Sequence, residues 1–382
     1  MIWPPPDLEA SLVEAMEEAV ATPPGDALHL TLEACRERVV RMAAGDINQS
    51  LSRRVIRLIV VACDKQRRGV VSTGILLPEE IAQAVGRARR TCQVLPTDPQ
   101  YPGMPGPPRP AAGMPDRFDE ATAAAAPEQL ATVAAACLES ARQQELEAAG
   151  ALRVTERLLL ARNSEGLATR SPSTKADLSV TCFAGASGER SSGYANRFAW
   201  KLGDLDPRRI ARDAGERARA GLQRRTLAPG PYTALLEPTA VADLVGIMAR
   251  IGFDATQVGE HRSFASGRLG EPILDRRFCL RDDPRHPKTA APLIDYEGVP
   301  TRSLTLVENG VLRETATHHR SAHIDGQPSN GHAADPLSAV NDVQFQHLVV
   351  DPGGSRREEL MRSLGTGIVI SRLWYARVTQ TR

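Results

Sequence analysis

The spacing of hydrophobic residues alternates between helical and strand periods over the N-terminal part of the chain. Apolar residues three or four positions apart, after three prolines, predict a helix over residues 7–21. Alternating apolar and polar residues predict strands over 28–32 and 51–61, and the second turns through a charged tip into a strand at 70–73. Pro78 and the two glutamates after it predict the next helix, since both suit a helix N-terminus.

Prolines and an alanine-rich stretch organise the middle of the chain. Eight prolines between residues 96 and 115 exclude a regular helix or strand there and predict a linker or a draped loop. Seven arginines crowd residues 208–225, which is typical of a solvated helix face, and the alternative is a groove for an acidic peptide. The elements expected in this part are a helix over 128–149, strands over 152–161, 178–184 and 190–198, a turn over 162–166 and a helix over 206–222.

Short strand patterns dominate the C-terminal part. We predict a strand over 232–236, an apolar helix over 239–251 and a final strand over 367–375. Apolar residues flank Asn309-Gly310, which is the strongest short signal for a β-hairpin. The predicted fold class is therefore α+β. The predicted domains are an N-terminal α+β unit of helix and antiparallel sheet (1–95), a Pro/Gly-rich linker (96–127), a central α/β unit (128–228) and a β-rich C-terminal domain (229–382).

The composition limits the kinds of partner and compartment. A net charge of +1 gives no case for nucleic acid or an anionic membrane as a partner. No apolar run reaches the roughly 18–20 residues of a membrane helix, and the N-terminus lacks the features of a secretory signal. The six cysteines are scattered without a Cys-x-x-Cys motif, which is typical of buried thiols in a reducing compartment. We therefore expect a cytoplasmic protein.

The segment Asp295-Tyr-Glu-Gly-Val-Pro-Thr-Arg302 holds the candidate binding site. Asp295 and Glu297 lie among turn-forming residues, so we interpret them first as caps that accept backbone N–H groups. The alternative is that these carboxylates line a peptide channel and recognise an N-terminal amine or a basic side chain. We assign no residue as catalytic. The candidate substrate-binding residues are Asp295, Glu297, Gly298, Thr301 and Asn309.

One group of histidines has the spacing of metal ligands. His319 and His323 are four residues apart and would share a helix face, and Asp325 and His332 follow nearby. Exposed or locally hydrogen-bonded histidines are the first interpretation, and a metal site with His319 and His323 as ligands is the alternative. The sequence contains neither His-Glu-x-x-His nor His-Glu-x-x-x-His.

Several motifs together resemble those of the TldD/PmbA family. The segment from Asp295 to Arg302, followed by Val-Glu-Asn-Gly-Val-Leu at 307–312, is similar to the signature and hairpin of that family. The resemblance implies the fold of the family and a role in zinc-dependent peptide cleavage. The other matching motifs are Arg68-Gly-Val-Val-Ser-Thr73, Arg162-Asn-Ser-Glu-Gly-Leu167, Asp204-Leu-Asp-Pro207, Ser266-Gly-Arg-Leu-Gly-Glu271, Asp282-Asp283-Pro284, Gln327-Pro-Ser-Asn-Gly-His-Ala333 and Leu373-Trp-Tyr375.

The resemblance also implies a branch of the family. TldD-type members carry His-Glu-x-x-x-His on a helix, which supplies zinc ligands and a general base. Gly246, Ile247 and Ile251 take these places here, so the chain resembles the PmbA/TldE branch, whose members pair with a TldD-type subunit. This implies a non-catalytic chain without a cofactor of its own, a TldD-type partner that holds the zinc, and an unfolded or leader peptide as substrate.

Two other functions stay open from the sequence. The chain is alternatively a stand-alone homodimer that binds peptides without hydrolysing them, or a divergent metal hydrolase that uses the cluster from His318 to His332. The family also continues for some tens of residues beyond the Leu-Trp-Tyr motif. We therefore expect an incomplete C-terminal domain with an open sheet edge.

Overall fold

A six-stranded antiparallel sheet runs along the molecule in the computed structural model, which describes residues 3–21, 27–108, 113–186, 189–338, 342–374 and 376. Its strands are β1 (Ala27–Ala43), β2 (Asp46–Asp64), β3 (Arg67–Thr73), β4 (Glu147–Asn163), β5 (Ala168–Ala184) and β6 (Ser191–Ala199). Their spatial order is β3-β2-β1-β4-β5-β6. Because β1 pairs with β4 from His29 to Met42, the strands of the predicted N-terminal and central units form one sheet.

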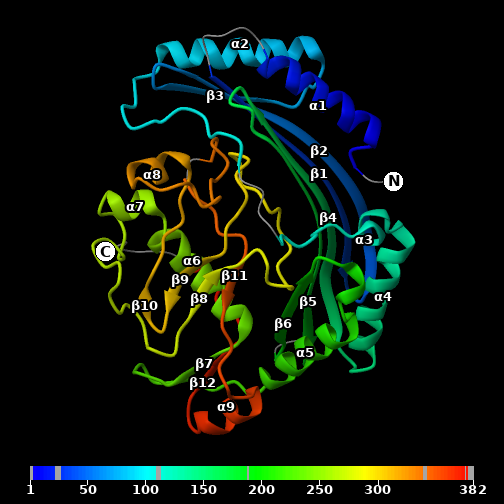
Figure 1. Cartoon of the computed structure of the whole chain (residues 1–382). Coiled ribbons are helices and arrows are strands. Elements are labelled where there is room, and N and C mark those ends of the chain that lie inside the picture. The colour runs from blue at the N-terminus through cyan, green and yellow to red at the C-terminus, as the bar shows by residue number, and fades with distance from the viewer. Residues whose placement is uncertain are drawn as a thin grey trace.

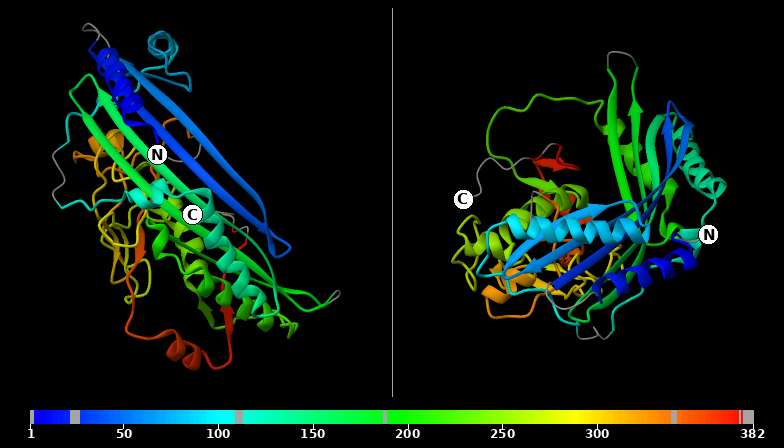
Figure 2. Two further views of the ribbon diagram at one scale, coloured as in Figure 1. Left: turned by 90° about the vertical axis from the view of Figure 1, so that its right-hand side faces the viewer. Right: turned by 90° about the horizontal axis from the view of Figure 1, so that it is seen from above.

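Helices cover the convex face of this curved sheet (Figures 1 and 2). Two of them lie at one end and two at the other, because each pair packs on a separate apolar cluster of the same face. The helices of this layer are α1 (Pro6–Val20), α2 (Pro78–Val94), α3 (Glu120–Ala124), α4 (Pro127–Arg142) and α5 (Pro207–Ala220), with a 3-10 turn at Leu202–Asp204. α1 and α2 belong to the first cluster, and α4 and α5 belong to the second.

A belt of buried polar residues separates the two apolar clusters. Arg36 and Glu156, on neighbouring strands, form an ion pair of 2.6 Å with side chains 8% and 1% exposed. Arg38 donates to the carbonyl of Thr122 in α3 at 2.9 Å, and Trp3 donates its backbone N–H to Glu156 at 2.7 Å. This belt therefore fixes α3 and the N-terminal segment to the middle of the sheet.

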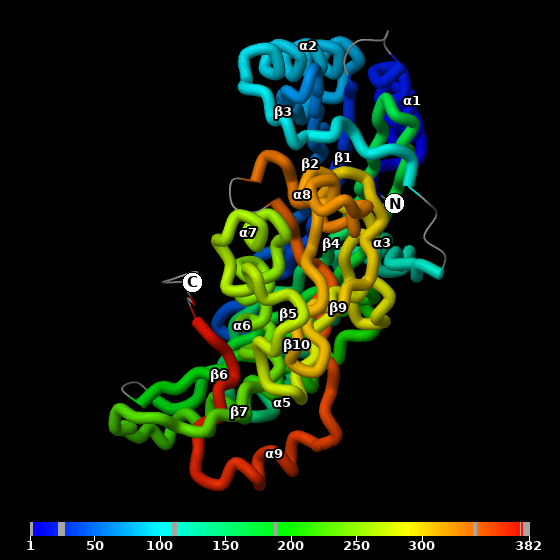
Figure 3. The backbone as a smooth tube through the Cα atoms, turned by 60° about the vertical axis from the view of Figure 1, so that its left-hand side comes forward, coloured from blue at the N-terminus to red at the C-terminus, as the bar shows by residue number. Residues whose placement is uncertain are grey.

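The C-terminal part of the chain lies against the concave face (Figures 1 and 3). A small sheet in the order β10-β9-β8-β11 and the parallel pair β12-β7 are its strands. Ile59 and Leu159, which point away from the convex face, pack there with Tyr101, Ile294 and Tyr296. The elements of this part are β7 (Ala234–Leu236), α6 (Pro238–Gly252), α7 (Ala255–Gly259), β8 (Leu280–Asp282), β9 (Leu304–Glu308), β10 (Val311–Leu312), α8 (His319–Ile324), β11 (Leu348–Val350), α9 (Arg357–Leu364) and β12 (Ile368–Ile370).

The α+β fold class and the hairpin at Asn309-Gly310 are confirmed. Val311 and Leu312 of β10 pair with Glu308 and Val307 of β9. The described residues between 96 and 119 contain no helix or strand, as the prolines predict. The C-terminal part contains the helices α7 and α9, which the strand pattern did not predict.

The predicted helix over residues 128–149 is wrong beyond Arg142. The helix ends at Arg142, the φ of Glu145 is 58°, and residues from Glu147 onward pair with β5. Alanine favours helices, but in this segment the pairing of β4 with β5 outweighs that preference. A Cβ added at Gly150 would lie 2.2 Å from the carbonyl oxygen of Ser179, so β4 and β5 approach closely there.

Several strands are longer or shorter than their patterns predicted. β1 continues beyond its predicted end through charged residues such as Glu33 and Arg36, which form ion pairs with neighbouring strands. β2 extends a few residues beyond both predicted ends. The final strand covers only Ile368–Ile370 of the predicted 367–375, and Tyr375 lies outside the described residues. Within the described part of the chain, no helix has the length and apolar character that a membrane span needs.

Candidate functional site

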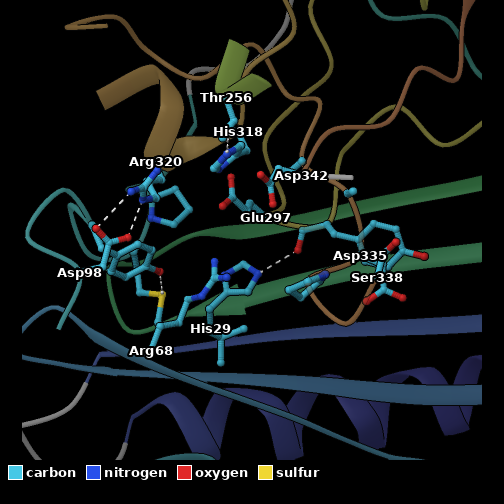
Figure 4. Close-up of a pocket in the computed structure, with 18 of the residues that line it drawn as sticks. His29, Arg68, Asp98, Thr256, Glu297, His318, Arg320, Asp335, Ser338 and Asp342 are labelled. Atoms are coloured by element: carbon cyan, nitrogen blue, oxygen red, sulfur yellow. Dashed lines mark hydrogen bonds and ion pairs between the residues drawn. The ribbon is translucent and has the colours of Figure 1, made fainter. Parts of the chain in front are cut away.

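A cavity of about 440 Å³ lies where the concave face of the sheet, the Pro-rich segment and the C-terminal part meet (Figure 4). Its walls come from residues far apart in the sequence. The sheet provides residues such as His29 and Arg68, and the Pro-rich segment provides residues such as Asp98 and Tyr101. The C-terminal part provides a third group. The principal polar residues from the C-terminal part are Thr256, Glu297, His318, Arg320, Asp335 and Asp342.

Asp295 builds the turn that carries the cavity wall. It is 1% exposed, and its Oδ1 accepts the backbone N–H groups of Glu297 at 3.0 Å and Val299 at 2.8 Å. Its Oδ2 accepts the N–H of Ala333 at 2.9 Å. Burial, followed by the nearby Glu297, holds the pKa of Asp295 well above its usual range. The capping role predicted for Asp295 is confirmed, and its carboxyl lies behind the cavity wall.

Glu297 extends from this turn into the cavity. Its Oε2 accepts the backbone N–H of His319 at 2.7 Å, so the start of α8 positions the carboxyl. The side chain is partly open to the cavity but otherwise surrounded by protein, and this burial raises its pKa to about 7. Arg68 opposes this increase in pKa and Asp342 adds to it. The carboxyl therefore changes charge near neutral pH.

Two histidines in the walls are uncharged at neutral pH. Burial lowers the pKa of His318 to about 4, and its Nε2 lies 3.0 Å from the hydroxyl of Thr256. Burial also lowers the pKa of His29 to about 4. The Nε2 of His29 lies 2.9 Å from the hydroxyl of Thr31 and 3.3 Å from the carbonyl oxygen of Tyr296.

An ion pair and hydrogen bonds hold the Pro-rich segment against the C-terminal part and β4. Arg320 of α8 donates to Asp98 at 3.2 Å and to Gln100 at 3.1 Å. At the other end of the segment, the amide of Asn163 donates to the carbonyl oxygen of Pro105 at 2.7 Å. The segment that the sequence predicts as a linker or draped loop thus forms one wall of the cavity.

A second cavity of about 260 Å³ adjoins the first and reaches α6. Tyr296, Ala334, Asp335 and Ser338 line both cavities, so the two share a wall. Gly246 of α6 lines the second cavity, and a Cβ added there would meet no atom within 4 Å.

The other predicted substrate-binding residues lie outside the first cavity. Gly298 has a φ of 71°, and an added Cβ would lie 2.5 Å from the Cβ of Ala161, so the turn packs on β4. Thr301 is 5% exposed and donates its N–H to the carbonyl oxygen of Leu293. Asn309 is exposed at the tip of the hairpin. Among the five, only Glu297 is in the lining.

The histidine cluster does not converge on one point. His323 is exposed, whereas His332 is 1% exposed and lies 3.3 Å from Asp282. His319 uses its backbone to hold Glu297. In the described ranges, no three His, Cys, Asp or Glu side chains are grouped so that they could hold a metal ion. The geometry therefore gives no support to a hydrolase built on these histidines.

Family models match two parts of the chain. Residues 116–222 match the PmbA/TldA metallopeptidase central domain, and residues 229–381 match the PmbA/TldA metallopeptidase C-terminal domain. Together they cover more than half of the sequence. The chain belongs to the PmbA/TldD metallopeptidase family.

Solved structures share the fold of this chain. TldE from Thermococcus kodakarensis superposes with a TM-score of 0.84 and 20% identity, over 96% of this chain and 83% of that one. A putative modulator of a DNA gyrase from Thermotoga maritima gives a TM-score of 0.79 and 23% identity, over 96% and 82%.

Curated relatives match over shorter stretches. Metalloprotease PmbA from Escherichia coli O157:H7 is 25% identical over 217 residues, which are 55% of this chain and 45% of that protein. The matched stretches of the four curated relatives cover 28% to 45% of their lengths.

Proposed function

We propose that this chain is a TldE-type subunit of a TldD-type zinc metallopeptidase system, and that it binds unfolded or leader peptides without cleaving them. The observation that carries the proposal is the surface of α6. The family resemblance puts the zinc-binding His-Glu-x-x-x-His motif at Gly246, Ile247 and Ile251, and Gly246 lines a cavity. The helix therefore occupies the position of the zinc-binding motif but lacks the side chains that would bind zinc.

The residues of α6 do not fit a zinc ion. Zinc in proteins takes nitrogen, sulfur or carboxylate oxygen ligands, and the side chains of Gly246, Ile247 and Ile251 have none. Arg250, the charged residue of α6 that lines the same cavity, is a cation and repels a metal. We therefore derive no hydrolytic step for this chain, and the proposed TldD-type partner supplies the zinc.

The two adjoining cavities support the peptide-binding part of the proposal. They share wall residues that include Tyr296, and together their linings reach from the Pro-rich segment to α6. Apolar side chains such as Val61, Leu95 and Met104 lie beside polar ones in the first cavity. Such a mixed lining suits a peptide, which presents apolar side chains and a polar main chain.

The experiment that tests the proposal is metal analysis of the purified chain after mild chelator dialysis, with a peptide-cleavage assay on the same sample. The proposal predicts no stoichiometric zinc and no cleavage of an unfolded peptide. About one zinc per chain together with cleavage would contradict it. His319→Ala and His323→Ala variants then show whether α8 holds that zinc.

A further inference from the structure

His29 leaves a hydrogen-bond acceptor without a partner in the wall of the first cavity. The hydroxyl of Thr31 donates to the carbonyl oxygen of Tyr296 at 2.8 Å, so its oxygen is free to accept the N–H at Nε2 of His29. The uncharged ring then carries no proton at Nδ1. His29 is 3% exposed, and its Nδ1 has no hydrogen-bond partner among the described residues. A buried acceptor of this kind favours a ligand that donates hydrogen.

Two carboxyl groups add further acceptors on the opposite side of the cavity. Figure 4 shows Glu297 and Asp342 directed into the same space, next to His318. One oxygen of Glu297 accepts from the backbone of His319, and the carboxyl keeps further acceptor positions. Ionised carboxylates and a neutral imidazole acceptor together attract an ammonium group.

Arg68 places a positive charge in the wall of this cavity. Its guanidinium lies 5.6 Å from the centre of the Tyr101 ring. In the part of the chain that the structure describes, Arg68 has no carboxylate within ion-pair distance, whereas Arg320 is paired with Asp98. Arg68 can therefore bind a carbonyl or carboxylate oxygen of a ligand.

We propose that this cavity is a receptor for the free amino terminus of a peptide. The α-ammonium group donates to Glu297 and to Nδ1 of His29, with Asp342 adding negative charge, and Arg68 binds an oxygen of the first residues. The volume of about 440 Å³ lies within the roughly 300–1,000 Å³ of small-ligand pockets, so it accommodates only the terminal residues. The inference rests on the proposed function for the nature of the ligand, and it names the end of the peptide that binds.

Two sources present this chemistry, namely a short free peptide and the start of a longer chain. Calorimetric titration of the full chain at pH 7.5 with trialanine, N-acetyl-trialanine and trialanine amide compares them. We expect trialanine to bind and acetylation to weaken binding at least tenfold, because it removes the ammonium charge. If the amide binds as tightly as trialanine, the ligand is the start of a longer chain. If the amide binds at least tenfold more weakly, Arg68 holds a free carboxylate and the ligand is a short peptide.

Substitutions test the named residues. Glu297→Gln keeps an acceptor for the N–H of His319 but removes the charge, and His29→Gln keeps a donor toward Thr31 but removes the Nδ1 acceptor. Each is expected to weaken trialanine binding about tenfold or more. Glu147→Gln makes the same change of charge in an exposed ion pair with Arg190 and should leave binding unchanged. Thermal unfolding shows whether each variant folds, and the comparison of free with acetylated peptide requires no variant.

Four outcomes would overturn the inference. Equal binding of trialanine and N-acetyl-trialanine would exclude recognition of the amine. Equal binding of N-acetyl-lysine amide and trialanine would assign the cavity to a basic side chain. If no tripeptide binds but an acetylated unfolded peptide of about twenty residues does, Nδ1 of His29 bonds to water and not to a peptide amine. The inference then fails, and the proposed function stands. Failure of every peptide, long or short, would reject the peptide-binding role as well.

Discussion

At the scale of single residues, burial sets the charge of the candidate site. The carboxyl of Glu297 has its pKa raised to about 7, whereas burial lowers the pKa of both His29 and His318 to about 4. Near neutral pH the histidines are therefore neutral, and Glu297 is the group that switches. The charged and titratable groups that face it are Asp295 of its own turn, His318 and His319 at the start of α8, Asp342, Arg68 of β3 and Tyr101 of the Pro-rich segment.

This switch predicts the pH dependence of peptide binding. Affinity for trialanine should increase as pH rises through about 7, because Glu297 becomes ionised. It should decrease above pH ~8, where an α-amino group loses its proton. Calorimetry from pH 5.5 to 9 measures both limbs. In Glu297→Gln the increase near pH 7 should disappear, and its persistence would show that another group controls binding.

The same pKa shift predicts an effect on the stability of the unliganded chain. A carboxyl whose pKa is raised on folding stabilises the fold fully below its unfolded pKa, and this contribution is lost as pH rises through the folded value. Raising the pKa of Glu297 from 4.5 to about 7 corresponds to about 3 kcal/mol. Urea unfolding at pH 4 and pH 8 should therefore show wild type losing stability relative to Glu297→Gln. No relative change between these pH values would contradict the shift.

The sequence singled out Glu297 but gave no site prediction for His29, Arg68 or Asp342. Glu297 belongs to a turn with a clear Asp-x-Glu-Gly pattern, whereas His29 is one histidine in an apolar strand and gives no signal. Arg68 begins a motif that resembles the family but carried no prediction of a site, and Asp342 belongs to no recognised motif. Their role depends on the tertiary packing of β3 against the C-terminal part, and local sequence patterns do not predict that packing.

At the scale of elements, the polar belt on the convex face connects the two halves of the long sheet. Arg36 and Glu156 are buried together between the two apolar clusters, beneath α3. The apolar alternation of β1 stops before Glu33 and Arg36, and this explains why β1 was predicted too short. The predicted and observed bounds agree better for α5 and α6, because proline and a periodic apolar face mark both helices.

The belt predicts unequal effects of two substitutions on the same strand. Glu156→Ala leaves Arg36 buried without this partner and should reduce the free energy of unfolding by about 3–5 kcal/mol. Glu147→Ala breaks only the exposed pair with Arg190 and should cost less than about 1 kcal/mol. Urea unfolding of both variants at pH 7 makes the comparison. Equal losses would show that the belt is not a main contact between the two clusters.

At the scale of the whole molecule, the curved sheet holds the C-terminal part so that the signature turn faces β1 and β3. Gly298 packs on β4, and Thr31 donates to the carbonyl oxygen of Tyr296, so the turn is attached to the sheet on both sides. The fold class and the hairpin follow from sequence patterns. The cavity does not, because it combines strand, Pro-rich and C-terminal residues that are brought together only by tertiary packing.

The most direct test of the central claim is reconstitution of peptide cleavage with a TldD-type subunit from the same organism. The rate of cleavage of a labelled unfolded peptide is measured with each subunit alone and with both, at equal zinc. We predict no cleavage by this chain alone and a rate with both subunits well above that of the TldD-type subunit alone. Cleavage by this chain alone, or a rate that its addition does not change, would contradict the account.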